Sequence, residues 1–352
     1  MRFLITGTAG FIGFHLATLM LAEGFRVVGL DGMTDYYDVR IKRRRHQMLL
    51  QHPNFTCTEA MLEDFDTLHG LCDRVRPQII IHLAAQAGVR YSLENPRAYM
   101  SANVMGTFNV MECAREFGVD HLLMASTSSV YGANDQMPFN EVDKTETPLT
   151  LYAATKKATE NMGHCYAHLW KIPTTMFRFF TVYGPWGRPD LALFKFVKAA
   201  LNDQAIDVYN HGNMARDFTF VTDLVRAIRL LVDTPPEQAG DRIILPGDSL
   251  SPVAPFRVVN IGNGTMVQLT DFIAEIERCL NLPIRRNLMP MQPGDVPATW
   301  ANSDLLERLT GFRPRTPVSE GVAAFVAWYK DYYGHDTHIT GGQTGSDARP
   351  AA

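Results

Sequence analysis

The chain has 352 residues, of which 46% are hydrophobic, and a formal net charge of −4. This size predicts two domains, or one domain with a substantial elaboration. The small charge gives no reason to expect nucleic acid or an anionic membrane as a partner, and no apolar run approaches the roughly 20 residues that span a bilayer. Five cysteines without Cys-x-x-Cys spacing indicate neither a metal site nor a disulfide framework, so we expect a cytoplasmic protein.

The first predicted elements are a short apolar strand at 2–6, a glycine-rich turn and a helix over 10–22. Gly7 permits a tight turn, Gly10 lets the backbone approach a pyrophosphate, and Gly13 lets the helix pack on the strand. The helix then directs its N-terminus at the phosphates. This arrangement predicts a dinucleotide-binding site rather than a glycine turn with no ligand.

A second predicted strand, at 25–30, ends in Asp31. A carboxylate there accepts hydrogen bonds from the adenosine ribose and repels a 2′-phosphate, which favours NAD over NADP. The basic run that follows, from Arg40 to Arg45, is interpreted as a solvated helix face, with contact to a phosphate as the alternative.

Further apolar strands are predicted at 55–60, 78–83, 120–126 and 173–180, with helices over 66–75, 98–117 and 151–170. Strands that alternate with helices indicate an α/β fold with a Rossmann-type, doubly wound parallel sheet. After residue 183 we expect a smaller α/β substrate-binding domain, whose predicted elements are a helix at 191–203, strands at 206–209 and 257–261, an exposed loop at 234–255, and helices at 270–280 and 319–333. The predicted division is therefore 1–182, with later segments returning to it, then 183–333, and a disordered tail at 334–352.

Tyr152 and Lys156 are four residues apart, so both side chains project from one face of the helix predicted over 151–170. An ammonium beside a phenol, whose ordinary pKa is about 10, stabilises the phenolate and makes tyrosine a usable acid or base. The polar run Ser126–Gly132 follows a predicted strand and reaches the carboxyl edge of the sheet, where ligands bind in such folds. Taken alone, the run also fits a polar turn that caps backbone groups.

Five more segments complete the pattern: His82–Ser92, Arg178–Asp190, Tyr209–Gly212, Arg216–Thr219 and Met291–Val296. Over about residues 1 to 333 the sequence resembles the extended short-chain dehydrogenase/reductase family, specifically its nucleotide-sugar epimerases, and most of all the UDP-glucuronate 4-epimerases. The resemblance implies NAD-dependent, reversible conversion of UDP-glucuronate to UDP-galacturonate through a transient 4-keto sugar. It also implies a homodimer formed through the helices at 98–117 and 151–170.

The resemblance assigns catalytic roles to three residues: Thr127 binds the 4-oxygen of the sugar, Tyr152 is the base, and Lys156 lowers its pKa and holds the nicotinamide ribose. The implied cofactor-binding residues are Gly7, Gly10, Phe11, Ile12, Gly13, Asp31, Leu62, Ala84, Ala85, Tyr152 and Lys156. The implied substrate-binding residues are Arg90, Ser128, Ser129, Thr181, Arg188, Arg216 and Asp295. Of this set, Arg216 and Arg188 are expected to bind the diphosphate of the substrate. The alternative for these two arginines is a structural ion pair.

Two positions depart from the family pattern: Met61 replaces an aspartate at the end of the third strand, and Gly32 replaces an asparagine after Asp31. We expect weaker or differently arranged cofactor binding there and no loss of activity. The alternative functions are UDP-glucose 4-epimerase, UDP-glucuronate decarboxylase and a non-catalytic NAD-sensing or scaffold protein. A 4,6-dehydratase is disfavoured because Ser128 and Ser129 occupy the positions of its Asp-Glu pair.

Overall fold

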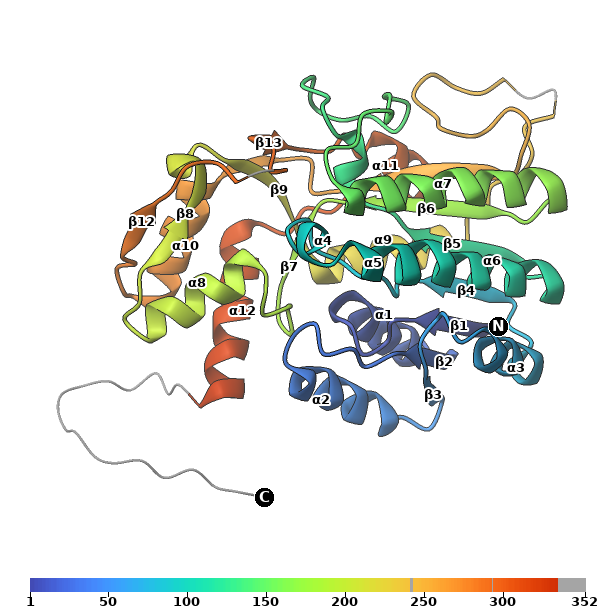
Figure 1. The fold of residues 1–352 in the computed structure, drawn as a ribbon, viewed down its shortest axis with the longest axis horizontal. Helices are drawn as coiled ribbons and strands as arrows, with labels where there is room; N and C mark the ends of the chain where they lie inside the picture. The colour runs from blue at the N-terminus through green and yellow to red at the C-terminus, as the bar shows by residue number, and fades with distance from the viewer. Residues whose placement is uncertain (241–242, 293, 335–352) are drawn as a thin grey trace.

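A seven-stranded parallel sheet forms the centre of the protein, in a computed structural model that describes residues 1–240, 243–292 and 294–334. Its strand order is β10-β6-β5-β4-β1-β2-β3 (Figure 1). The strands are β1 (Arg2–Thr6), β2 (Arg26–Asp31), β3 (Phe55–Glu59), β4 (Ile79–His82), β5 (His121–Ala125), β6 (Thr174–Phe179) and β10 (Phe256–Ile261). The order reverses between β1 and β4, which is where doubly wound folds bind their ligands.

Helices cover both faces of this sheet because its strands are apolar on both sides. Phe3 and Ile5 of β1 join one buried cluster, and Leu4 between them joins the other. The first cluster includes helices α1 (Phe11–Ala22), α2 (Val39–Leu50), α9 (Val221–Val232) and α11 (Asp304–Thr310). The second includes α3 (Phe65–Val75), α6 (Gly106–Phe117) and α7 (Leu151–Trp170). The predicted doubly wound α/β fold is confirmed.

A smaller lobe packs beyond the carboxyl ends of the strands, around a third apolar cluster in which the rings of Phe218 and Phe272 stack at 3.9 Å. Its helices are α8 (Ala192–Leu201), α10 (Leu269–Leu280) and α12 (Val318–Tyr333). Its strands are β7 (Thr181–Tyr183), β8 (Ile206–Val208), β9 (Ala215–Phe220), β11 (Met266–Gln268), β12 (Arg286–Leu288) and β13 (Ala298–Thr299). Of the later segments, β10 is a strand of the central sheet, and α9 and α11 pack against that sheet. The domain boundary at 182/183 stays a prediction.

The helix expected over 98–117 is interrupted. It consists of α5 (Pro96–Tyr99), a π-helical stretch (Met100–Met105) and α6, and it follows the short helix α4 (Tyr91–Glu94). The buried Asn103 in the π-helical stretch bonds both backbone groups of Gln86, at 2.8 and 3.0 Å. A π-helical turn of this kind is often found at functional sites.

The basic run indicated a helix face within α2, but the sequence did not predict α9 or α11. The loop expected at 234–255 contains neither helix nor strand in its described residues. Apart from Gly334, the predicted tail at 334–352 lies outside the described residues. Within the ranges that the structure describes, no helix combines the length and the apolar character needed to cross a membrane.

Candidate active site

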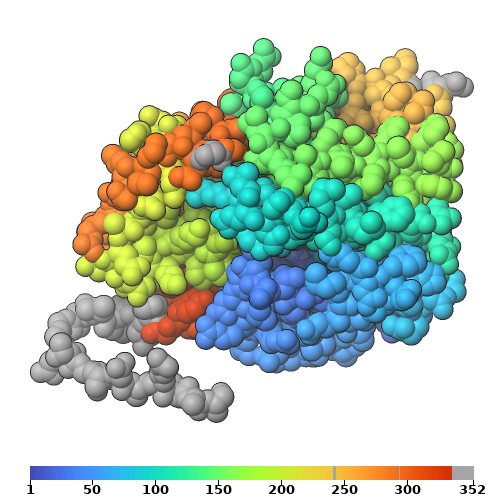
Figure 2. All heavy atoms as spheres, in the orientation of Figure 1, coloured from blue at the N-terminus to red at the C-terminus, as the bar shows by residue number. Residues whose placement is uncertain are grey.

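A cavity of about 770 Å³ opens at the carboxyl ends of the central strands, between the sheet and the smaller lobe. Figure 2 shows a recess on this side of the molecule, between the blue N-terminal segment and the cyan segment. Every residue that the sequence assigned to the cofactor, the substrate or catalysis lines this cavity, with the exception of Arg90. The candidate residues are therefore brought together from segments far apart in the chain.

The glycine-rich turn forms one end of the cavity. Gly7 has a φ of +81°, and a Cβ atom at Gly13 would lie 2.0 Å from the carbonyl oxygen of Gly7, so neither position tolerates a side chain. The N-cap of α1 is Gly10, which makes no side-chain capping bond. Backbone N–H groups at the start of α1 can therefore bind an anion such as a pyrophosphate.

The carboxylate of Asp31 is held at the end of β2 by the backbone amides of Ala9 and Met33, both at 2.9 Å. It lines the cavity beside the turn, where a ribose hydroxyl can reach it. The glycine cradle and this fixed carboxylate together fit a dinucleotide.

The interpretation of the run from Arg40 to Arg45 as a solvated face is wrong for two of its members. Lys42 and Arg45 are buried on the inner face of α2, whereas Arg40, Arg43 and Arg44 are exposed. Arg45 donates to the carbonyl of Ala9 at 2.9 Å and to that of Trp186 at 2.5 Å. Its guanidinium is buried because those backbone acceptors replace water, and it joins the glycine-rich turn to the loop before Arg188.

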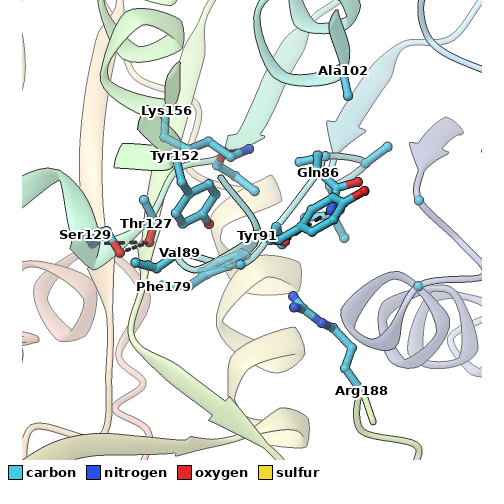
Figure 3. Close-up of a pocket in the computed structure, with 18 of the residues that line it drawn as sticks. Gln86, Val89, Tyr91, Ala102, Thr127, Ser129, Tyr152, Lys156, Phe179 and Arg188 are labelled. Carbon is cyan, nitrogen blue, oxygen red and sulfur yellow. Dashed lines mark hydrogen bonds between the residues drawn. The ribbon is translucent and has the colours of Figure 1, made fainter. Parts of the chain in front are cut away.

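Tyr152 and Lys156 project from the first turns of α7, which begins after Thr150 accepts a hydrogen bond from the amide of Ala153. Figure 3 shows both side chains in the cavity, with Thr127 on one side and Arg188 reaching in from another wall. Lys156 donates to the carbonyl of Ala125 at 3.0 Å, and burial lowers its pKa to about 8. The ammonium is therefore charged at neutral pH.

The phenol of Tyr152 lies in an environment with opposing effects. Burial raises its pKa above the usual value, while the hydrogen bond with Thr127 and the charge of Arg188 lower it. The hydrogen bond and the nearby charge favour the phenolate, the form that a general base requires, and so act against the effect of burial. That Lys156 lowers this pKa stays a prediction.

Hydroxyl groups surround the same point of the cavity. Thr127 ends the extended segment after β5 and caps a 3₁₀ turn (Ser128–Tyr131), accepting a bond from the amide of Ser129 at 3.2 Å. Its own hydroxyl donates to that of Ser129 at 3.2 Å (Figure 3). Thr181 begins β7 and faces the same space. The segment is therefore both the capping turn that the sequence allowed and a part of the cavity wall that presents hydroxyl groups.

The arginines differ in their partners. Arg188 forms an ion pair with Asp190 at 2.5 Å, which is the structural role considered as the alternative to substrate binding. The side chain of Arg188 also lines the cavity. Arg216 donates to the carbonyls of Ala215 and Pro297, and the neighbouring carboxylate of Asp217 is bonded to backbone amides instead. Arg216 lines the cavity together with Asp295, the carboxylate whose charge acts on its guanidinium.

Arg90 is the predicted residue that does not line the cavity. It pairs with Asp295 at 3.1 Å and stacks on the ring of Tyr209 at 4.3 Å. Asp295 does line the cavity, so Arg90 contacts the site through that carboxylate.

Sequence reasoning missed a buried group behind the catalytic helix. Glu160 accepts hydrogen bonds from Ser126 at 2.6 Å and from Arg178 at 2.9 Å. The signal was available, because Glu160 follows Tyr152 and Lys156 at the same spacing of four residues and so lies on the same side of α7.

The family model described as GDP-mannose 4,6 dehydratase matches residues 4–325. The chain belongs to this family of extended short-chain dehydrogenases/reductases. It is 55% identical over 336 residues to a probable UDP-glucuronate 4-epimerase of Rhizobium meliloti (strain 1021), covering 95% of this chain and 98% of the relative. UDP-glucuronate 4-epimerase 4 of Arabidopsis thaliana is 41% identical and is covered over 76% of its length, along 95% of this chain.

The fold of this family member also matches a solved structure. The UDP-glucuronic acid 4-epimerase from Bacillus cereus, crystallised with UDP-glucuronic acid and NAD, superposes with a TM-score of 0.84. The two chains are 29% identical, over 95% of this chain and all of the other. The family resemblance inferred from the motifs is confirmed.

Proposed function

We propose that the protein is an NAD-dependent UDP-glucuronate 4-epimerase, which interconverts UDP-glucuronate and UDP-galacturonate through a transient 4-keto sugar. The observation that carries this proposal is the convergence of Tyr152, Lys156 and Thr127 with Ser128, Ser129 and Thr181 in the cavity that also contains the dinucleotide cradle. Relatives 55% and 41% identical carry the name of this activity, and they support it.

The residues that would hold NAD are the turn Gly7–Gly13, with Phe11 and Ile12 at the start of α1, the carboxylate of Asp31, and the wall formed by Leu62, Ala84 and Ala85. Lys156 would bind the nicotinamide ribose, beside Tyr152 on α7. When bound, NAD supplies an acceptor from which the same hydride can be returned.

The proton of the reaction is handled by Tyr152. Its phenolate takes the proton of the sugar 4-hydroxyl as the keto group forms, and its phenol gives that proton back when the keto group is reduced. Thr127 orients the 4-oxygen, and the charged ammonium of Lys156 favours the phenolate. Because hydride leaves and returns, there is no net oxidation, and the sugar inverts when the 4-keto ring presents its opposite face.

The uronic acid makes the intermediate unstable. A keto group at carbon 4 turns the carboxylate on carbon 5 into a β-keto acid, which loses carbon dioxide readily. The hydroxyls of Ser128, Ser129 and Thr181 would hold the carboxylate in a polar setting and restrain this loss, because an apolar site would favour decarboxylation. This cradle favours the epimerase over the decarboxylase and over a UDP-glucose 4-epimerase, which needs no carboxylate site.

At the other end of the substrate, Arg216 and Arg188 would bind the diphosphate of UDP through guanidinium donors. Asp295 would accept a ribose hydroxyl, and Arg90 would fix that carboxylate through their ion pair.

We also propose a homodimer in the cytoplasm. Exposed apolar side chains gather along the helices expected at the interface, and a second copy would remove them from water. They are Met100, Met105, Phe108, Leu169 and Trp170.

Five free cysteines in the chain fit a reducing compartment.

The experiment that tests the function is incubation of the purified protein with UDP-glucuronate, without added reductant, followed by NMR of the sugar. We expect UDP-galacturonate to form, and the Tyr152→Phe variant to form about 10² to 10⁴ times less per unit time. Absence of UDP-galacturonate, or turnover of UDP-glucose alone, would contradict the proposal.

A further inference from the structure

An apolar side chain faces the cofactor end of the cavity where a polar one is expected. Met61 lies just beyond the end of β3, and 42% of its surface is exposed. It lines the cavity together with Gly32, which follows Asp31 at the end of β2. A solvent-exposed thioether in a ligand cavity suits contact with a planar ring, because sulfur makes favourable contacts with aromatic groups.

The position of Met61 identifies which ring this is, provided that the proposed NAD cofactor is correct. A bound pyrophosphate would lie at the start of α1 after β1, and Asp31 at the end of β2 would mark the adenosine ribose, since both segments line the cavity. The next strand outward in the sheet is β3. The base attached to that ribose therefore lies beside the end of β3, where Met61 and Gly32 meet.

Gly32 and Met61 are sterically matched. A Cβ atom at position 32 would lie 2.4 Å from the sulfur of Met61, so the thioether fills the volume that a side chain at position 32 would need. The φ angle of Gly32 is not in the left-handed region, so it is this sulfur that limits position 32.

The chemistry of this pair differs from that of a carboxylate. A thioether is a weak acceptor and makes no strong hydrogen bond with an exocyclic amine. The carbonyl of Leu62, which follows Met61, already accepts from Asn109 at 2.9 Å. Glu63 also lines the cavity and is the carboxylate nearest to Met61 in the chain, so it has to be tested separately.

We infer that Met61 and Gly32 form an adenine seat that binds the base by apolar contact with its ring, so that the 6-amino group of adenine contributes little to cofactor affinity. The seat makes these two positions determinants of cofactor specificity. A carboxylate at position 61 would instead accept a hydrogen bond from the 6-amino group of adenine.

A competition between two dinucleotides tests this inference. The full-length protein is incubated with equal concentrations of NAD and nicotinamide purine dinucleotide, in which hydrogen replaces the 6-amino group, and the bound fraction is quantified by chromatography. We expect the wild-type chain and Met61→Leu to retain the two within about twofold of each other, since neither side chain bonds the amine strongly. Met61→Asp should favour NAD by about tenfold or more, because the charged carboxylate then accepts a hydrogen bond from the 6-amino group.

Two results would decide against the inference, and a third would decide against the proposed function. A tenfold preference of the wild-type chain for NAD contradicts it, and loss of that preference in Glu63→Gln would assign the amine to Glu63. An unchanged ratio in Met61→Asp contradicts it as well, because the base would then lie elsewhere. Retention of neither dinucleotide contradicts the proposed function itself, which distinguishes the two failures.

The steric match gives a second, independent readout. Gly32→Ala should speed dissociation of both dinucleotides in the Met61 chain, because the new methyl group displaces the sulfur. In the Met61→Ala background the same change should have little effect, since the sulfur is gone. Equal effects in the two backgrounds would show that the residues are not coupled, and would overturn the seat.

Discussion

Glu160 accepts a hydrogen bond from the hydroxyl of Ser126 at 2.6 Å, and this contact joins the helix that carries Tyr152 and Lys156 to the strand end that carries Thr127. Arg178 of β6 binds both oxygens of the same carboxylate, and both side chains are almost fully buried. Helix α7 and strands β5 and β6 are therefore fixed relative to one another directly behind the candidate catalytic groups.

Glu160→Gln should destabilise the protein by about 3 to 5 kcal/mol, because it leaves the charge of Arg178 buried without its counter-ion. Urea unfolding measures this loss. Asp233→Asn is a matched control, since it breaks a more exposed pair that Arg229 makes in α9, and it should cost much less. Equal losses in the two variants would contradict the importance of the buried pair.

The pH profile of turnover should show the ionisation of Lys156. Burial lowers its pKa to about 8, so the ammonium is charged below that pH and loses its proton above it. If this charge stabilises the phenolate of Tyr152, kcat should fall as the pH rises above about 8. Lys156→Arg keeps its charge at high pH, so its alkaline limb should move upward even if kcat is lower throughout. If kcat falls at the same alkaline pH in both proteins, the ionisation that causes the fall belongs to a group other than Lys156.

Thr181→Val tests the carboxylate cradle. The substitution keeps the shape of the side chain and removes its hydroxyl, so a 4-keto uronic acid in the site should lose carbon dioxide more often. Release of labelled carbon dioxide from UDP-glucuronate labelled in its carboxylate measures the effect against UDP-galacturonate formed. Ser128→Ala should act in the same direction. If neither variant releases more than the wild-type enzyme, the hydroxyls do not restrain decarboxylation.

His82 should contribute to acid sensitivity. Its ring is buried between the hydroxyls of Thr6 and Thr107, and burial lowers its pKa to about 3. The unfolded chain, with a histidine pKa of about 6.5, then binds more protons than the folded one, so stability is lost as the pH falls from about 6.5 toward 3. The slope for one such group is about 1.4 kcal/mol per pH unit. His82→Gln should make the measured slope shallower between pH 6 and 4, and an unchanged slope would exclude this contribution.

Local spacing explains why much of the site could be predicted from the sequence. The turn Gly7–Gly13, Asp31 and the pair Tyr152 and Lys156 are each defined within a few residues, where periodicity and backbone sterics decide the structure. The strands of the sheet were also recognisable, because burial on both faces makes them continuously apolar.

What could not be predicted depends on contacts between distant segments. The pairing of Arg178 with Glu160 and the burial of Arg45 require acceptors that only the folded chain supplies. A charged residue on a helix resembles a solvated one until its partners are known, so α2 was interpreted as a surface feature. Helix α9 is different, because its apolar residues Leu224, Ile228 and Leu231 follow helical spacing and make it predictable from the sequence.

The central claim is that hydride leaves carbon 4 of the sugar and returns to the same carbon. UDP-glucuronate deuterated at carbon 4 tests it directly, with NMR and mass spectrometry of the product made in ordinary water. We predict UDP-galacturonate that keeps its deuterium at carbon 4 and takes up no solvent hydrogen there. Replacement of that deuterium by solvent hydrogen would contradict a reversible hydride transfer and the role assigned to Tyr152.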